Sequence, residues 1–191
     1  MKRACVFLAE GFEEVEALTP VDYLRRAGVE VTTLAIGRVR VTGSHGIEVA
    51  ADLPVAQALA MGAATATGGS WDVVVVPGGQ PGSRNIAASQ EAIAIILHQA
   101  ARGGLVAAIC AAPAVVLHGA CGLLAGRRFT GYPGTEASVT GATFVPDRVV
   151  VEGNLITARA AGCAGEFSVA IVEALLGRDA ARELAGKVLL G

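Results

Sequence analysis

Cys110 is the residue whose surroundings point most directly to chemistry. It follows the short apolar run Leu105–Ile109, typical of a strand buried on both faces, and precedes Pro113, which suits the first turn of a helix. A sharp strand-to-helix turn holds its side chain at the edge of a sheet, as in a nucleophile elbow with cysteine in place of serine. The positive end of the helix would favour the thiolate. The alternative is a small core residue, as many free cysteines are.

Three carboxylates form a second group that could do chemistry. Glu13, Glu14 and Glu16 open a predicted helix that runs to Arg26 and stops at Gly28. Acidic residues in a first turn usually complement the helix dipole, which is a structural role. Helical spacing does not choose among the three, so the sequence pattern leaves open which of them, if any, takes part in a reaction.

A glycine pair follows the apolar run Trp71–Val76, which predicts a central strand. In Pro77–Gly82, Gly78 and Gly79 would let backbone N–H groups come close to a ligand at the end of that strand. The alternative is a tight connecting turn. Neither of the glycine-rich phosphate motifs, GxGxxG and GxxxxGK[ST], occurs, so a nucleotide cradle is poorly supported.

The histidines offer Cys110 no obvious partner. His118 lies eight residues further on, roughly 12 Å along a helix. His98 falls in the middle of another predicted helix, and both read as ordinary helix residues. His45 lies at a predicted hairpin tip and would approach the site only in an unusual arrangement or from a second subunit. A papain-like Cys–His mechanism is therefore disfavoured, and the same scarcity argues against a metal site.

The elements that must position these residues alternate between strand and helix. The predicted strands are Ala4–Ala9, Glu30–Ile36, Trp71–Val76, Leu105–Ile109, Arg127–Gly131, Ala142–Val145, Val149–Glu152 and Leu155–Ala158, with an extra hairpin of Val39–Thr42 and Ile47–Ala50. The predicted helices are Glu13–Arg26, Val55–Met61, Glu91–Arg102, Ala112–Gly119, Cys163–Leu176 and Asp179–Leu189, and Ala63–Gly69 is a predicted loop. This order predicts an α/β fold whose mostly parallel sheet has helices on both faces. Ligands of such sheets bind beyond the carboxyl ends of the strands, so the three groups converge if their strands are neighbours.

Composition limits the class of protein. The 191 residues fit a single domain, residues 1–191, with a core of aliphatic residues, since 53% are hydrophobic and only 4% aromatic. The net charge of −2 gives no basic face for nucleic acid, and the low charge suggests an oligomer. The uncharged run Gly103–Gly126 is better explained as a strand and helix than as a membrane span.

Cysteine usage and the start of the chain bear on the compartment. The four cysteines include no CxxC pair, so neither a disulfide framework nor a zinc ribbon is indicated. The first apolar run stops at Glu10, too soon for a signal peptide, and a cytoplasmic location is expected. Cys163 is expected to pack in the core or begin a helix, and its part in any redox chemistry stays open.

Four segments together resemble one family. They are Glu10–Glu16, Asp72–Gly79, Ala107–Pro113 and Ala170–Leu175, and they occur in order over nearly the whole chain. They resemble the ThiJ/PfpI superfamily, whose members include class I glutamine amidotransferase-like proteins. The closest likeness is to its branch of Parkinsonism-associated protein deglycases and glutathione-independent glyoxalases, bacterial type. The resemblance implies a flavodoxin-like three-layer sandwich that forms a homodimer.

The resemblance also implies roles for single residues. Cys110 would be the reactive thiol, and Glu16 the protonated carboxylic acid beside it, with a pKa raised by burial next to a thiolate. The backbone N–H groups of Gly79 and Ala111 would form an oxyanion hole, and Gly78 and Tyr132 would line the pocket. No cofactor and no metal are implied. Tyr132 stands where some members carry a histidine, which puts any step needing imidazole in doubt.

The activity implied is a cofactor-independent glyoxalase III or protein deglycase type, a hydro-lyase or hydrolase. A Cys110 hemithioacetal, assisted by Glu16, would convert methylglyoxal or glyoxal to lactate or glycolate, or would reverse early glycation adducts on protein side chains. The alternative is a non-enzymatic redox-sensing or chaperone-like stress-response dimer in which Cys110 is oxidised. A hydratase or amidotransferase-like thiol enzyme is a weaker idea. Peptidase activity is disfavoured because Ala111 follows Cys110, where the protease-like branch has histidine.

Overall fold

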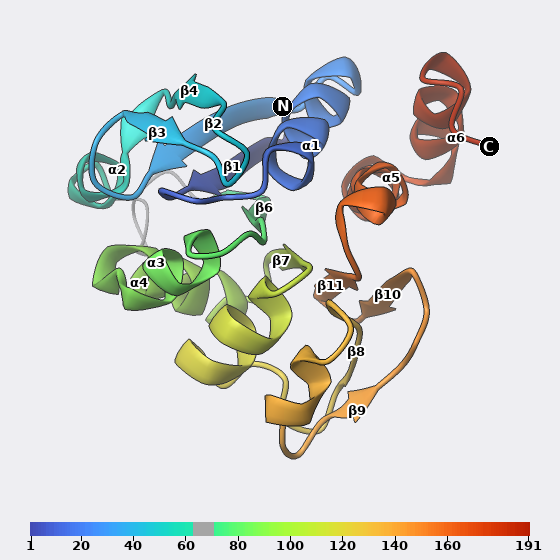
Figure 1. The fold of residues 1–191 in the computed structure, drawn as a ribbon. Helices are drawn as coiled ribbons and strands as arrows, with labels where there is room; N and C mark the ends of the chain where they lie inside the picture. The colour runs from blue at the N-terminus through green and yellow to red at the C-terminus, as the bar shows by residue number, and fades with distance from the viewer. Residues whose placement is uncertain (63–70) are drawn as a thin grey trace.

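A mostly parallel sheet organises the chain. The computed structural model describes residues 1–62 and 71–191. Its central sheet has seven strands in the order β10-β11-β7-β6-β1-β2-β5 (Figure 1). The strands are β1 Arg3–Leu8, β2 Glu30–Ala35, β5 Leu53–Pro54, β6 Val73–Val76, β7 Leu105–Ile109, β10 Val149–Glu152 and β11 Leu155–Ala158. β10 pairs antiparallel with β11 and the other pairs are parallel, which confirms the predicted fold class.

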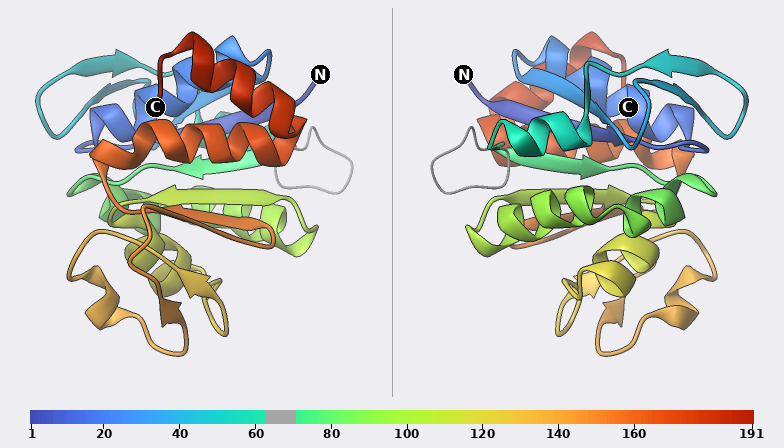
Figure 2. Two further views of the ribbon diagram at one scale, coloured as in Figure 1. Left: turned by 90° about the vertical axis from the view of Figure 1, so that its right-hand side faces the viewer. Right: turned by 90° about the vertical axis from the view of Figure 1, so that its left-hand side faces the viewer.

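Helices cover both faces of this sheet, as the two views of Figure 2 show. One face carries α1 Glu14–Arg26, α5 Ala164–Leu176 and α6 Arg178–Lys187. The other carries α2 Val55–Ala60, α3 Gly82–Ala88, α4 Gln90–Ala101 and the π-helix η1 Pro113–Ala120. The result is the predicted three-layer sandwich.

The unbroken apolar runs of the central strands follow from this layering. In β6, Val73 and Val75 pack into the core beneath α1 and α5, while Val74 and Val76 pack into the core on the opposite face. Successive side chains of a strand point to opposite faces, so a strand covered on both sides needs apolar residues at every position. β1 and β7 follow the same rule, and their interior residues are fully buried.

Three neighbouring strands carry the predicted site segments. β7, β6 and β1 are consecutive in the sheet, and Val75 of β6 lies in register with Val6 of β1 and Ala107 of β7. Their carboxyl ends therefore meet at one edge. The segments that follow β1, β6 and β7 therefore lie close together, as expected for neighbouring strands.

Smaller elements lie outside the central sheet. They are the hairpin of β3 Arg40–Thr42 and β4 Glu48–Ala50, the parallel pair of β8 Arg128–Phe129 and β9 Thr143–Phe144, and the 3-10 helices η2 Thr135–Ser138 and η3 Ala161–Cys163. The hairpin docks on the start of α1. The N–H of Gly11 donates to the carbonyl of Thr42 and the N–H of Ser44 to the carbonyl of Phe12, each at 2.8 Å.

The structure differs from the sequence prediction in two helices, and it adds strand β5 and the 3-10 helices η2 and η3, which were not predicted. Helix α3 was not predicted, because it begins at Pro81-Gly82, a pair that signals a turn, and buries only one large side chain, Ile86. The helix after Cys110 is a π-helix, with the N–H of Cys121 donating to the carbonyl of Val116 five residues back. The predicted loop Ala63–Gly69 lies outside the described residues. Within residues 1–62 and 71–191, no helix has the length and apolar character needed to cross a membrane.

Candidate active site

Cys110 sits at the turn between β7 and η1, where the sequence placed it. Its φ is 66°, a left-handed conformation that is uncommon for residues other than glycine. Both of its backbone groups are held: its N–H donates to the carbonyl of Ala158 at 2.9 Å, and its carbonyl accepts from the N–H of Tyr132 at 2.7 Å. The turn holds a partly exposed thiol at the carboxyl edge of the sheet. Strained backbone of this kind is concentrated at functional sites.

Glu16 lies beside this thiol. It is in the first turn of α1 and only 1% exposed, and its Oε2 accepts a 3.0 Å hydrogen bond from the N–H of Gly78. Its Oε1 is buried with no nitrogen or oxygen partner among the described residues. The Cys110 side chain lies next to this carboxyl group, since a Cβ on Gly78 would touch both.

Gly78 makes this approach possible. A Cβ at this position would lie 2.6 Å from the Cβ of Cys110 and 3.1 Å from its Sγ, and it would also overlap Oε2 of Glu16. No side chain fits between the thiol and the carboxyl group. Gly78 is therefore required for the close packing of Cys110 against Glu16, and the approach of a ligand to this loop stays a prediction.

Burial controls the carboxyl group of Glu16. Its removal from water raises the pKa of Glu16 to about 7, and the negative charge of Glu13 acts in the same direction. The hydrogen bonds from Cys110 and from the N–H of Gly78 oppose the rise. Glu16 is thus poised to hold or release a proton near neutral pH.

The thiol of Cys110 does not have a low pKa on its own. Burial, the charge of Glu16 and the hydrogen bond to Glu16 raise the pKa of Cys110 to about 12, against the lowering effect of the N–H groups of Gly79 and Ala111. The N–H of Ala111, next to the start of η1, lowers the pKa of Cys110 in the direction expected of the helix end, but burial and Glu16 outweigh this effect. Two of the three opposing causes depend on an ionised Glu16, so a thiolate forms more readily when Glu16 holds the proton. The two groups titrate as a pair.

The backbone N–H groups of Gly79 and Ala111 act on the sulfur of Cys110 as donors that lower its pKa. Gly79 has a φ of 90°, and a Cβ there would lie 2.6 Å from the carbonyl carbon of Phe12. The loop after β6 is therefore pressed against the loop after β1. Both predicted oxyanion-hole donors therefore lie close to the thiol.

Tyr132 also lies next to Cys110, through the backbone hydrogen bond already described. Its side chain is 50% exposed. The structure therefore brings together all six predicted site residues: Cys110, Glu16, Gly78, Gly79, Ala111 and Tyr132.

The other cysteines have no comparable setting. Cys5 is fully buried in β1, and burial raises its pKa far above the usual range. Burial raises the pKa of Cys121 to about 11. Cys163 is 5% exposed, packs in the core and immediately precedes α5, which confirms the structural role expected for it.

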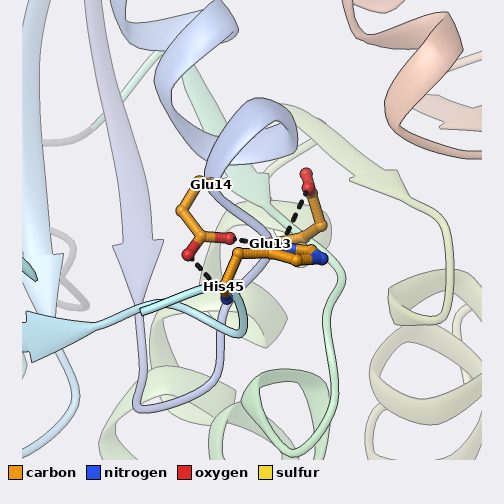
Figure 3. A group of neighbouring side chains, drawn as sticks. All are labelled: Glu13, Glu14 and His45. Atoms are coloured by element: carbon orange, nitrogen blue, oxygen red, sulfur yellow. Dashed lines mark hydrogen bonds and ion pairs between the residues drawn. The ribbon is translucent and has the colours of Figure 1, made fainter. Parts of the chain in front are cut away.

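Two of the three histidines are helix residues, as predicted, and the third makes contacts that were not predicted. His118 lies on η1, where its Nε2 accepts from the N–H of Thr140 at 3.4 Å, and His98 is in the last turn of α4. His45, expected near the site only in an unusual arrangement or from a second subunit, reaches the start of α1 within the same chain. Its Nδ1 lies 2.9 Å from Oε2 of Glu14 and 3.8 Å from Oε1 of Glu13 (Figure 3).

Glu14 anchors this hairpin loop, a role that the sequence analysis missed. Its Oε1 accepts from the N–H of His45 at 2.8 Å and of Ile47 at 3.4 Å, and its Oε2 contacts Nδ1 of His45. Burial works against the charge, but hydrogen bonds from the His45 ring and from backbone N–H groups lower the pKa of Glu14 to about 2. The sequence signal was present in Gly43, where a Cβ would lie 2.7 Å from Cγ of Glu14.

Glu13, Glu14 and His45 are residue types that can bind metals, and their ligand atoms lie within 4.8 Å of one another. Both oxygens of Glu14 already accept hydrogen bonds from the loop. The structure therefore accounts for the group as a hydrogen-bonded cluster, and we do not assign these residues as metal ligands.

Comparison with known proteins identifies the family. The DJ-1/PfpI family model matches residues 2–174. The chain belongs to the DJ-1/PfpI family. It is 38% identical to protein dj-1beta of Drosophila melanogaster over 99% of this chain and 97% of that protein. It is also 32% identical to a deglycase of Pyrococcus abyssi over 84% of this chain and 91% of that protein.

Solved structures of the DJ-1/PfpI family agree with the fold. The oxidised DJ-1 of Toxoplasma gondii superimposes with a TM-score of 0.92 at 31% sequence identity, covering 99% of this chain and 98% of that one. The flavodoxin-like sandwich implied by the resemblance is thus confirmed, and the cysteine turn lies in a fold shared with DJ-1 proteins.

Proposed function

We propose that this DJ-1/PfpI protein is a cofactor-independent cysteine enzyme that acts on reactive 2-oxoaldehydes. The observation that carries the proposal is the grouping at Cys110: one buried carboxyl group with a pKa of about 7 and two backbone N–H donors surround one partly exposed thiol. A nucleophile, a proton carrier and an oxyanion hole are what carbonyl addition requires. The resemblance to a deglycase is consistent with carbonyl chemistry.

The reaction of methylglyoxal begins with attack of the Cys110 thiolate on the aldehyde carbon. The C–S bond forms, the carbonyl electron pair moves to oxygen, and the N–H groups of Gly79 and Ala111 stabilise that oxygen while Glu16 supplies its proton. Glu16 then takes the proton from the former aldehyde carbon, which is oxidised, and returns it to the neighbouring ketone carbon, which is reduced. The hydroxyl proton on the former aldehyde carbon moves to the ketone oxygen, so a thioester carbonyl forms beside a new hydroxyl group. The product is a lactate thioester of Cys110. Water hydrolyses it to lactate and the free thiol, so the net reaction adds one water.

The same attack extends to early glycation adducts. A protein amine or thiol that has added to methylglyoxal is in equilibrium with the free aldehyde, and consumption of that aldehyde at Cys110 would return the side chain to its unmodified state. Protein deglycase activity is therefore proposed as the same chemistry on a different source of substrate.

Conversion of methylglyoxal to lactate without glutathione tests the proposal. The wild-type protein is expected to produce lactate, Cys110→Ser to lose the activity, and the matched variant Cys121→Ser to retain it. Full activity in Cys110→Ser would contradict the proposed mechanism. Absence of turnover by the folded wild-type protein, with either methylglyoxal or glyoxal, would contradict the proposed substrate class.

A redox role is the second candidate, favoured by the contrast between a partly exposed Cys110 and the buried Cys5 and Cys163. Two equivalents of hydrogen peroxide would convert the thiol to a sulfinate with release of two waters. Mass spectrometry is expected to find the sulfinate first at Cys110. Earlier oxidation of Cys121 would count against this role.

We also propose that the protein forms a homodimer, as the resemblance implies. Val15 on α1 and Ile47 beside the hairpin are 49% and 53% exposed, and both line one surface depression with Leu18. An apolar patch of this kind suits a subunit contact. Light scattering is expected to give twice the chain mass, with Ile47→Lys shifting the protein toward the monomer. A wild-type monomer at micromolar concentration would contradict the dimer.

A further inference from the structure

We propose that Glu13 and His45 are positioning residues that set where the shared proton of the Cys110–Glu16 pair resides. Glu13 acts through its contact with the backbone of Glu16 and through its charge, and His45 acts through the charge it places beside Glu13. The consequence for turnover rests on the proposed function. The effect on the thiol does not, because it can be measured without a substrate.

Glu13 is hydrogen-bonded to two backbone groups next to the Glu16 carboxyl group, one on Glu16 and one on Gly78. Its Oε2 accepts a 2.8 Å hydrogen bond from the N–H of Glu16, and its own N–H donates to the carbonyl of Gly78 at 3.1 Å. Gly78 in turn donates to Oε2 of Glu16. The Glu13 side chain is only 14% exposed, so water screens its charge weakly. Consistent with this geometry, the charge of Glu13 contributes to the raised pKa of Glu16.

His45 places an opposing charge against Glu13. Its Nδ1 is 3.8 Å from Oε1 of Glu13, and the ring is held by Glu14, as Figure 3 shows. The hydrogen bond to Glu14 and the charges of Glu14 and Glu13 raise the pKa of His45 above its usual value. While His45 is protonated, it offsets part of the field that Glu13 exerts on Glu16. When it loses the proton, that field is no longer offset.

The ring of His45 can be changed without releasing the loop. The N–H groups of His45 and Ile47 bind Oε1 of Glu14, and the N–H of Ser44 binds the carbonyl of Phe12. These contacts come from the backbone and do not involve the imidazole. Because 69% of the His45 side chain is exposed, its replacement also leaves no cavity.

The other charged side chains near Glu13 and His45 either have partners of their own or form no ion pair with Glu13. Glu10, on the loop after β1, accepts from the N–H of Thr42 at 3.3 Å. On the hairpin, Arg40 and Glu48 pair with each other at 2.7 Å. Among the described residues, neither Arg40 nor Arg84 of α3 forms an ion pair with Glu13. On α1 itself, Glu14 is bound to the loop, which leaves Glu16 and the thiol as the titrating pair.

The pH dependence of Cys110 alkylation tests the proposal. Iodoacetamide modification is followed by mass spectrometry of the Cys110 peptide, which separates it from the other three cysteines. The wild-type rate should rise in a first step where the pair loses its first proton. Glu13→Gln keeps the oxygen that accepts from Glu16 but removes the charge, so the step should move to lower pH, by about half a unit. His45→Gln removes the cation, so the step should move to higher pH, again by about half a unit.

Opposite shifts in Glu13→Gln and His45→Gln distinguish an effect of charge from a general disturbance of the structure. Glu48→Gln, which removes a charge from the same hairpin away from Glu13, is the matched control and should leave the step in place. Coinciding profiles for the wild type and His45→Gln, or shifts of the same sign in both variants, would overturn the proposal. If Glu13→Gln fails to fold, the shift in His45→Gln decides alone.

This experiment is independent of the substrate. Opposite shifts without methylglyoxal turnover would retain the positioning role and reject the proposed function. Turnover of methylglyoxal with unshifted alkylation profiles would retain the proposed function and reject the positioning role.

Discussion

Glu14 and Glu16 belong to the same turn of α1, and both side chains are almost inaccessible, yet their carboxyl groups are driven in opposite directions. Glu14 accepts hydrogen bonds from several donors of the hairpin loop, and its pKa falls to about 2. Glu16 accepts from the N–H of Gly78 and otherwise faces a thiol, and its pKa rises to about 7. Burial is common to both. The number of donors that the fold supplies decides which carboxyl group has a lowered pKa and which has a raised one, as the proposed proton carrier requires.

The two positions also differ in what covers them. Glu14 is covered by a thin loop whose His45 is itself largely exposed. Glu16 lies between α1, the loop after β6 and the turn after β7. Glu14 therefore remains near solvent, whereas Glu16, the proposed proton carrier, is enclosed beside Cys110, the proposed nucleophile.

The largest expected difference between the two concerns catalysis. Glu16→Gln keeps the size of the side chain but removes the transferable proton, and turnover of methylglyoxal should fall on the order of 100-fold or more. Glu14→Gln should change turnover only a few-fold, because the carboxyl group of Glu14 is bound to the loop. Lactate formation measures both. Equal losses in the two variants would break the distinction between carrier and anchor.

Next in size is the effect of Glu16 on stability. Because its folded pKa lies above the ordinary value of about 4.3, its contribution is fully present below pH 4.3 and is lost as the pH rises through about 7. The wild type should lose on the order of 3 kcal/mol relative to Glu16→Gln between pH 4 and pH 8, and less where the thiol gives up the proton instead. Urea unfolding at each pH gives this difference. A constant difference would contradict the raised pKa.

Glu14 should act in the opposite pH range. Its folded pKa lies below the ordinary value, so its contribution is present above about pH 4.3 and is lost as the pH falls toward 2. Because the covering loop is thin and solvent screens the charge, we expect about 1–2 kcal/mol at neutral pH. The stability advantage of the wild type over Glu14→Gln should shrink between pH 5 and pH 2. An advantage that grows on acidification would reverse the assignment.

The smallest effect should come from Ser44. Its hydroxyl contacts Oε2 of Glu14 at 3.4 Å, near the limit of a hydrogen bond, whereas the backbone N–H of His45 is at 2.8 Å. Ser44→Ala should change the free energy of unfolding by less than about 0.5 kcal/mol. A loss several times larger would mean that loop side chains, rather than the backbone, hold Glu14.

Sequence patterns predicted most of the fold and two parts of the candidate site, Cys110 and the glycine pair Gly78-Gly79. Apolar runs with turn signals placed β7, β10 and β11 at the bounds that the structure shows. The elbow at Cys110 and the glycine pair after β6 followed from the same local rules. Helix α3 was missed because a helix that packs through one large apolar residue lacks the periodicity that identifies such elements.

The choice of Glu16 could not be made from the pattern. Its orientation depends on how α1 rotates against the sheet, which the packing of Ala17, Val21 and Leu24 fixes, and on the absence of a side chain at Gly78. Only the family resemblance distinguished it from its neighbours. His45 lies at the hairpin tip as predicted, but its contacts with Glu13 and Glu14 could not be foreseen, since docking of the hairpin on α1 joins segments about thirty residues apart.

Direct titration of the two carboxyl groups tests the central claim. Carbon-13 NMR of the Glu side-chain carboxyls, assigned with Glu14→Gln and Glu16→Gln, reports each midpoint without a substrate. We expect the Glu16 signal to titrate near pH 7 and the Glu14 signal near pH 2. Midpoints for both near the ordinary value of about 4.3 would contradict the account.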